Sequence, residues 1–133
     1  MAARRIARLL LPVAEAAGGF TSTQLLVRAP DEAVMWQPDV ALVIGEAPAD
    51  GQLREPPALV AVVDVGDATP ILDVQQWLRL GVAVVWHVHE ESVDVWTRSA
   101  MHGHGPGEVI TLSDLPLPVA AGVRVSDVVG PRS

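Results

Sequence analysis

The sequence contains no cysteine, no tyrosine and no lysine among its 133 residues. Without cysteine, the chain can form no disulfide, no thiolate nucleophile and no cysteine-ligated zinc site. Hydrophobic residues make up 50% of the chain, but no apolar run approaches the roughly 20 residues of a membrane-spanning helix. We therefore expect a single cytoplasmic domain over residues 1–133, with a buried core and no membrane association.

Positive charge is also scarce. The formal net charge is −7, and all nine basic residues are arginines. Binding of nucleic acid without sequence preference depends on cations that neutralise phosphates, so an acidic chain is a poor default DNA-binding protein. DNA still stays a candidate partner, because Arg4 and Arg8 are spaced to share one face of a helix and to form a local basic patch.

The N-terminal part of the chain predicts a helix followed by a pair of strands. Residues 1–17 are expected to form an amphipathic helix that ends at a glycine pair. The apolar patch "LLLPVA" within it is too short for an export signal. Strands over 21–29 and 34–44 are expected to pair antiparallel around a turn at 30–33. Residues 45–57 are rich in glycine, proline and charge and predict a surface loop.

The middle of the chain predicts a strand, a helix and a second strand. "ALVAVVDV" (58–65) is too continuously apolar for a half-exposed strand, so we place it centrally in a sheet covered on both faces. A helix over 67–82 with Gly81 at its end and a strand over 82–90 follow, which implies a right-handed parallel crossover. With a further strand at 92–98, the fold class is α/β (α+β), a mixed central sheet flanked by helices.

Four histidines form two His-x-His pairs. His87 and His89 alternate along a predicted strand and should share one face. His102 and His104 repeat this spacing within residues 101–130, which we expect to be a flexible glycine-rich loop followed by a short strand or an extended tail. A zinc or nickel site would form if loop and strand met. Polar surface or interface histidines are the default interpretation.

Tryptophan supplies most of the aromatic content. Trp77 lies on the apolar face of the predicted helix and Trp86 in an apolar strand, so both are expected in the core. Trp36 and Trp96 are also expected in the core, with a groove or a subunit contact as the alternative.

Four segments, taken in order, resemble the Uma2 family of restriction-endonuclease-like proteins. "QPDVALV" is similar to the family's Pro-Asp strand, and "PPALVAVVDV" to its central strand that ends in an acid. "DVQQWLRLGVAVVWHV" resembles its helix and the Gly-Val-x-x-x-Trp strand after it, and "LSDLPLPVAAGVRVSDVV" its C-terminal tail. The resemblance covers roughly residues 36–128 and implies a restriction-endonuclease-like core of the PD-(D/E)xK nuclease fold.

The resemblance implies a metal site at two acids. Asp39 and Asp64 match the family's catalytic and metal-binding positions, and two carboxylates on adjacent strands are suited to hold Mg²⁺. Each acid also has a structural interpretation. Asp39 could satisfy a turn or a backbone donor at a strand edge, and Asp64 could cap the turn that follows its strand. A carboxylate buried in an apolar run needs a partner, a metal or a raised pKa.

The family's lysine has no counterpart here. Two residues past the second acid stands Gly66, and one helical turn before Trp77 stands Asp73. An acid in place of a cation inverts the local charge, so the resemblance implies Mg²⁺ binding that is weak or lost and turnover that is lost. Arg79 lies two residues past Trp77 and should point elsewhere.

Three functions are consistent with these observations. The first is a catalytically degenerate nuclease-fold protein that acts as a binding or assembly module, as a homodimer through an edge strand or an exposed apolar surface. The second is an active Mg²⁺-dependent DNA endonuclease that uses Arg79 or a partner's residue in place of lysine. The third is a non-catalytic protein-interaction module in which the acids are structural.

Overall fold

The computed structural model describes residues 2–28, 35–63, 70–112 and 122–130. The helices there are α1 (Ala2–Ala16), α2 (Pro70–Arg79) and α3 (Val125–Val129). The first six strands are β1 (Gly19–Ser22), β2 (Leu26–Arg28), β3 (Met35–Trp36), β4 (Val40–Ile44), β5 (Gln52–Leu53) and β6 (Leu59–Val63). The others are β7 (Val84–Val88), β8 (Val93–Trp96), β9 (Met101–His104), β10 (Val109–Thr111) and β11 (Gly122–Arg124).

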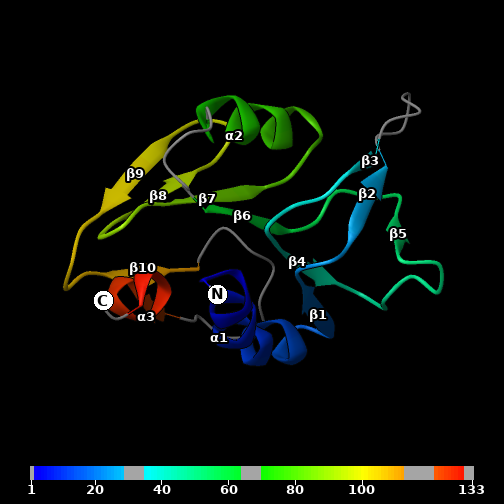
Figure 1. Ribbon diagram of the computed structural model, residues 1–133, viewed down its shortest axis with the longest axis horizontal. Helices are drawn as coiled ribbons and strands as arrows, with labels where there is room; N and C mark the ends of the chain where they lie inside the picture. The colour runs from blue at the N-terminus through cyan, green and yellow to red at the C-terminus, as the bar shows by residue number, and fades with distance from the viewer. Residues whose placement is uncertain (1, 29–34, 64–69, 113–121, 131–133) are drawn as a thin grey trace.

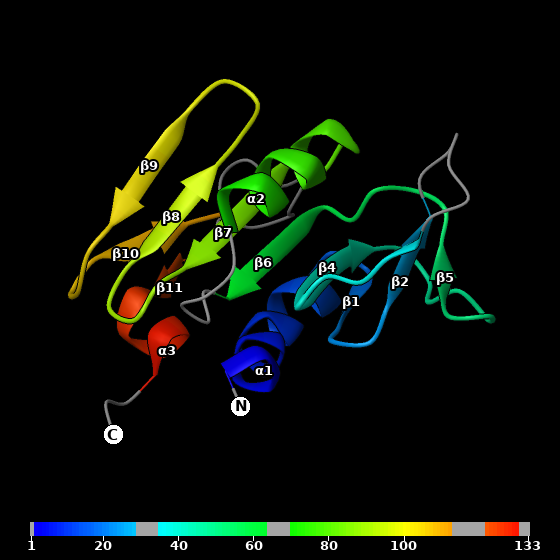
Figure 2. The same cartoon turned by 45° about the horizontal axis from the view of Figure 1, so that its top comes forward.

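The centre of the fold is a six-stranded mixed sheet in the order β1-β4-β6-β7-β8-β9 (Figure 2). β6 and β7 run parallel, and the other neighbours run antiparallel. The parallel pair follows from the crossover through α2, which covers one face of the sheet, whereas α1 and α3 lie on the other (Figure 1). The predicted fold class, a mixed central sheet flanked by helices, is confirmed.

Both faces of the central strands are buried, which explains their continuous apolar runs. On the α1 side, Ile6 and Leu10 pack with sheet residues such as Trp86, and we call this cluster core 1. On the α2 side, Val74 and Trp77 pack with sheet residues such as Val60, and we call this cluster core 2. Successive residues of one strand alternate between core 1 and core 2, so core membership shows which face a strand residue occupies.

The N-terminal strands differ from the prediction because two local features interrupt them. The strand predicted over 21–29 divides into β1 and β2 where the Ser22 hydroxyl accepts a hydrogen bond from the Gln24 amide (3.1 Å) and turns the chain. The strand predicted over 34–44 divides into β3 and β4 around Pro38, which has no amide hydrogen for a sheet ladder. β2 joins β3 and the short β5, which lies in the predicted loop, in a second sheet.

The prediction of a flexible loop at the start of 101–130 is wrong for β9. The chain reverses where the Thr97 amide donates to the Ala100 carbonyl (2.9 Å), and β9 then pairs with β8 along its whole length. The turn predicted at 30–33 lies outside the described residues. Of the helices that the structure describes, none is long and apolar enough to cross a membrane.

Candidate functional site

Asp39 lies immediately before β4, next to the end of β6. Pro38 before it is buried and Val40 after it lies in core 1, whereas Asp39 itself is exposed. Its Oδ2 accepts a hydrogen bond from the Val63 amide at 2.8 Å. The antiparallel register, which pairs Val40 with Ala61, brings the start of β4 to the end of β6. The Asp39 carboxylate is therefore held beside the last residue of the central strand.

The structural role predicted as an alternative for Asp39 is present, since the carboxylate does satisfy a backbone donor. Its other oxygen, Oδ1, makes no hydrogen bond within the described residues. A carboxylate oxygen is the donor type that Mg²⁺ prefers. Asp39 is thus chemically suited to contribute one ligand. Asp64, which follows Val63 in the sequence, lies outside the described residues, as do Gly66 and the side chain of Asp73.

A cleft of about 400 Å³ opens beside Asp39 where α1 begins. Arg4 lines it together with Thr23 and Gln24 from the segment between β1 and β2. A second cleft of about 320 Å³ shares these three residues and adds Arg8, the next exposed arginine along α1. The helical spacing of the two arginines was visible in the sequence, but the position of Arg4 beside Asp39 depends on how α1 packs across the sheet.

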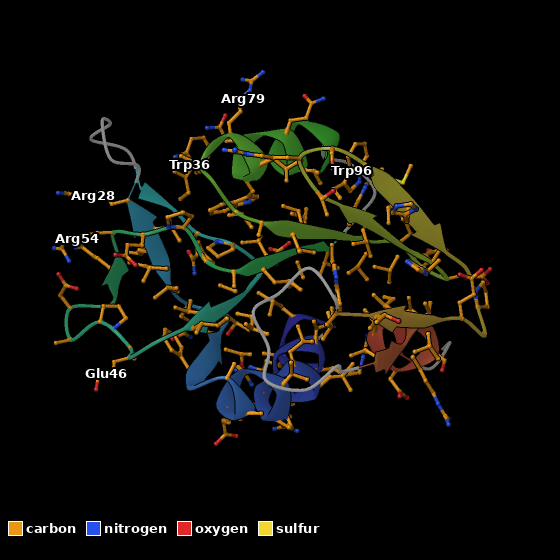
Figure 3. The ribbon with its side chains drawn as sticks, turned by 180° about the vertical axis from the view of Figure 1, so that it is seen from behind. Arg28, Trp36, Glu46, Arg54, Arg79 and Trp96 are labelled. Atoms are coloured by element: carbon orange, nitrogen blue, oxygen red, sulfur yellow. The ribbon has the colours of Figure 1, made fainter. Side chains whose placement is uncertain are left out.

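Arg79 does not point toward the sheet. It is exposed at the last residue of α2 and projects outward from the helix (Figure 3). This orientation agrees with the expectation that Arg79 points elsewhere. The apolar face of α2 carries Val74 and Trp77 into core 2, so the geometry of the helix directs Arg79 to solvent.

The two His-x-His pairs lie on opposite faces of the sheet. His102 and His104 pair across strands with Val95 and Val93, which belong to core 1, and cross-strand partners share a face. His87, by contrast, lies between Trp86 and Val88, both of which belong to core 1, and therefore faces the α2 side. The hypothesis of a single zinc or nickel site formed by both His-x-His pairs is therefore wrong.

Sequence reasoning missed the residue that does join His87 and His89. Asp94 pairs with His87 across β7 and β8, and its Oδ2 lies 2.8 Å from Nε2 of His89. One ligand atom from each of these three residues lies within 4.8 Å of the others. Only the register of the two strands brings Asp94 to the histidines, and spacing along the sequence does not reveal that register.

The tryptophans stabilise the two cores. Trp86 is fully buried in core 1, and Trp77 is buried in core 2. Trp36 packs edge-to-face on Trp77, with ring centroids 6.5 Å apart and planes at 69°. Trp36 and Trp96 are partly buried against core 2 (Figure 3), as the core interpretation predicted.

Comparisons with known proteins identify the fold. No family model matches the sequence, and no curated protein matches it. Among solved structures, the chain is similar to a protein described as a "putative nuclease belonging to DUF820" from Anabaena variabilis ATCC 29413. The TM-score is 0.70 at 12% sequence identity, over 97% of this chain and 80% of that one. The chain therefore has the nuclease-like fold that the resemblance implied.

Proposed function

We propose that this protein is a nuclease-fold protein similar to the Uma2 family that binds a divalent cation at Asp39 and Asp64 but does not hydrolyse DNA. The observation that supports this best is the hydrogen bond from the Val63 amide to Asp39. It fixes one carboxylate at the end of the strand that leads into the second acid. Oxygen ligands from both acids would suit Mg²⁺, bound weakly because two carboxylates leave most of its coordination positions to water.

The binding role rests on two clefts that share Arg4, one of which includes Asp39. Arg4 borders both clefts and Arg8 borders one, so two guanidinium groups lie along a path that reaches the carboxylate. Guanidinium groups recognise phosphates by paired hydrogen bonds. DNA is the ligand that this chemistry fits, and a net charge of −7 keeps the binding weak and sensitive to salt.

The loss of hydrolysis follows from the missing cation. Cleavage of a phosphodiester places extra negative charge on the phosphorus oxygens in the transition state, and a positioned positive group stabilises that charge. The chain has no lysine, and Arg79 points away from the sheet. Gly66 and Asp73 occupy the positions where the family has its lysine.

Restoring the lysine tests this proposal. Gly66→Lys and Asp73→Lys should each be assayed for nicking of supercoiled plasmid with Mg²⁺ and with Mn²⁺, beside the unmodified chain. We expect no nicking by the unmodified chain and nicking by at least one lysine variant. Adding Asp39→Asn to that variant should abolish the gained activity, which separates a restored site from a contaminating nuclease.

An active endonuclease is the second candidate, and the position of Arg4 favours it. An arginine beside Asp39 places a positive charge where a phosphate would bind, although a guanidinium cannot act as a base. This candidate predicts nicking by the unmodified chain that both Arg4→Gln and Asp39→Asn abolish. The third candidate, a protein-interaction module, predicts neither metal nor DNA binding.

The homodimer is part of the proposal for an assembly module. β9 is an edge strand of the six-stranded sheet, and its residue Met101 is 47% exposed. An unpaired strand edge is a template for pairing with a second chain. Sedimentation equilibrium tests this directly. A dimer that dissociates with Met101→Glu would support the edge-strand contact, and a monomer at all concentrations would exclude it.

A further inference from the structure

His87, His89 and Asp94 form a compact group at one end of the sheet, on the face that α2 covers. His87 is the fourth residue of β7, and the backbone turn that joins β7 to β8 begins at His89, whose amide donates to the Ser92 carbonyl (2.8 Å). The rings of His87 and His89 lie with their centroids 4.0 Å apart. The end of β7 therefore positions His87 and His89, and the neighbouring strand β8 positions Asp94 beside them.

The group is closed on one side and open on the other. His87 is buried, with 8% of its surface exposed. The side chains of His89 and Asp94 retain 32% and 27% exposure, so solvent reaches the group from their side. A small ion could enter there without any movement of the backbone.

The neighbouring strand leaves room for the carboxylate. Gly103 on β9 pairs with Asp94, and a Cβ at this glycine would lie 3.1 Å from Oδ1 of Asp94. A side chain at position 103 would therefore crowd the carboxylate. With glycine there, Asp94 can rotate between His89 and a ligand in the open side of the group.

We propose that His87, His89 and Asp94 bind Zn²⁺ or a chemically similar transition-metal ion, at a site separate from the Mg²⁺ site proposed above. Two imidazole nitrogens and one carboxylate oxygen are ligands that suit Zn²⁺ and not Mg²⁺. Neighbouring ligand atoms in a tetrahedral zinc site lie about 3.4 Å apart, given bonds of about 2.0 to 2.1 Å. The three ligand atoms lie within 4.8 Å of one another, and small side-chain rotations would bring them to this distance. Water completes the coordination on the open side.

The hydrogen bond between His89 and Asp94 is compatible with this site. In the metal-free protein the two groups bond to each other at 2.8 Å. On binding, the proton on Nε2 of His89 would pass to solvent if the ring is an imidazolium, or would be replaced by one on Nδ1 if the ring is neutral. Nε2 and a carboxylate oxygen of Asp94 would then both be able to face the metal. The pair thus keeps two ligands close together before the ion arrives.

The site is also spatially distinct from Asp39. β6 lies between β4 and β7 in the sheet, and neighbouring strands are about 4.8 Å apart, so roughly 10 Å separates the strand that Asp39 precedes from the strand of His87. Asp39 also lines a cleft with Arg4 of α1, whereas His87 faces the α2 side of the sheet. Substitution of Asp39 therefore tests the Mg²⁺ proposal without removing a ligand of the Zn²⁺ proposal.

Calorimetric titration of tag-free protein with Zn²⁺, and with Co²⁺ followed by visible absorption, tests the site. We expect one Zn²⁺ per chain and an intense tetrahedral Co²⁺ spectrum. His89→Gln and Asp94→Asn, both at partly exposed positions, should weaken binding about tenfold or more. The double variant His102→Asn/His104→Asn is the matched control, because it removes the other His-x-His pair, and it should bind as the unmodified chain does.

Thermal unfolding of each variant without metal shows whether it is folded, so that a loss of binding can be assigned to a lost ligand. Asp39→Asn should leave Zn²⁺ binding unchanged, which separates this site from the proposed Mg²⁺ site. The proposal is overturned if the unmodified chain binds no Zn²⁺, if folded His89→Gln and Asp94→Asn bind it as tightly as the unmodified chain, or if the His102→Asn/His104→Asn control loses it.

Discussion

The Val63 amide donates a 2.8 Å hydrogen bond to Oδ2 of Asp39, and this bond joins the last residue of β6 to the residue that precedes β4. It lies beyond the last ladder pair between the two strands, Val40 with Ala61. The carboxylate thus replaces a backbone acceptor at the point where the sheet ladder ends. One oxygen of Asp39 is used in this way, and Oδ1 makes no hydrogen bond to the residues that the structure describes.

Substitution of Asp39 should separate its structural role from its chemical role. Asp39→Asn keeps an oxygen that can accept from Val63, so we expect the free energy of unfolding to change little. Asp39→Ala removes the acceptor and should lower the free energy of unfolding by about 0.5 to 1.5 kcal/mol, toward the low end because the group is exposed. Urea denaturation of the two variants measures the difference. Equal destabilisation by both would show that the hydrogen bond contributes little.

Arg4 should contribute to any binding of DNA. Arg4→Gln removes a positive charge from the cleft at Asp39 and from the neighbouring cleft that Arg8 lines. We therefore expect weaker binding of a DNA duplex, and about one fewer counterion released on binding, which lowers the dependence of the affinity on salt. Fluorescence anisotropy at several salt concentrations measures both quantities. Arg28→Gln is the control, since Arg28 is an exposed arginine on β2 that does not line either cleft (Figure 3). Equal losses from the two variants would contradict a phosphate path along α1.

The contact between α1 and α3 should make Gly130 sensitive to substitution. Arg5 donates hydrogen bonds to the carbonyls of Val128 (3.2 Å) and Val129 (2.9 Å) at the end of α3. Gly130 has φ of 77°, and a Cβ there would collide with the Arg5 guanidinium. We expect Gly130→Ala to lower the free energy of unfolding by about 1 to 3 kcal/mol, from backbone strain and the displaced arginine.

Gly107→Ala is the matched control for this effect. Gly107 has a similar φ of 86°, but nothing lies within 4 Å of a Cβ at this position. It should therefore show the cost of the backbone conformation without the collision. If thermal unfolding shows equal losses for Gly107→Ala and Gly130→Ala, the contact with Arg5 does not stabilise the fold.

The strand, helix and strand unit at the centre of the fold was predictable, because a strand that is buried on both faces has a continuous apolar run in the sequence. The run that ends at Val63 and the run around Trp86 are continuously apolar, and a helix with a glycine after it separates them. Such a pattern depends on local residue types, so the parallel pairing of β6 and β7 followed from it.

The rest of the site was not predictable, because it depends on register between strands. Asp94 reaches His87 only through the pairing of β7 with β8, and His102 turns away because β9 pairs with β8 in the register that it has. Glycine at 103 was interpreted as a loop signal, whereas in the structure it makes space beside Asp94. A glycine-rich sequence does not distinguish these two roles.

The central claim is a divalent-cation site at Asp39 and Asp64 without hydrolysis. Calorimetric titration of Mg²⁺ into the unmodified chain, Asp39→Asn and Asp64→Asn, with plasmid nicking assayed in the same samples, tests it most directly. We predict weak, saturable binding that each substitution abolishes, and no nicking in any sample. An unmodified chain that binds no Mg²⁺, binding that survives Asp39→Asn and Asp64→Asn, or nicking that depends on these acids would contradict the claim.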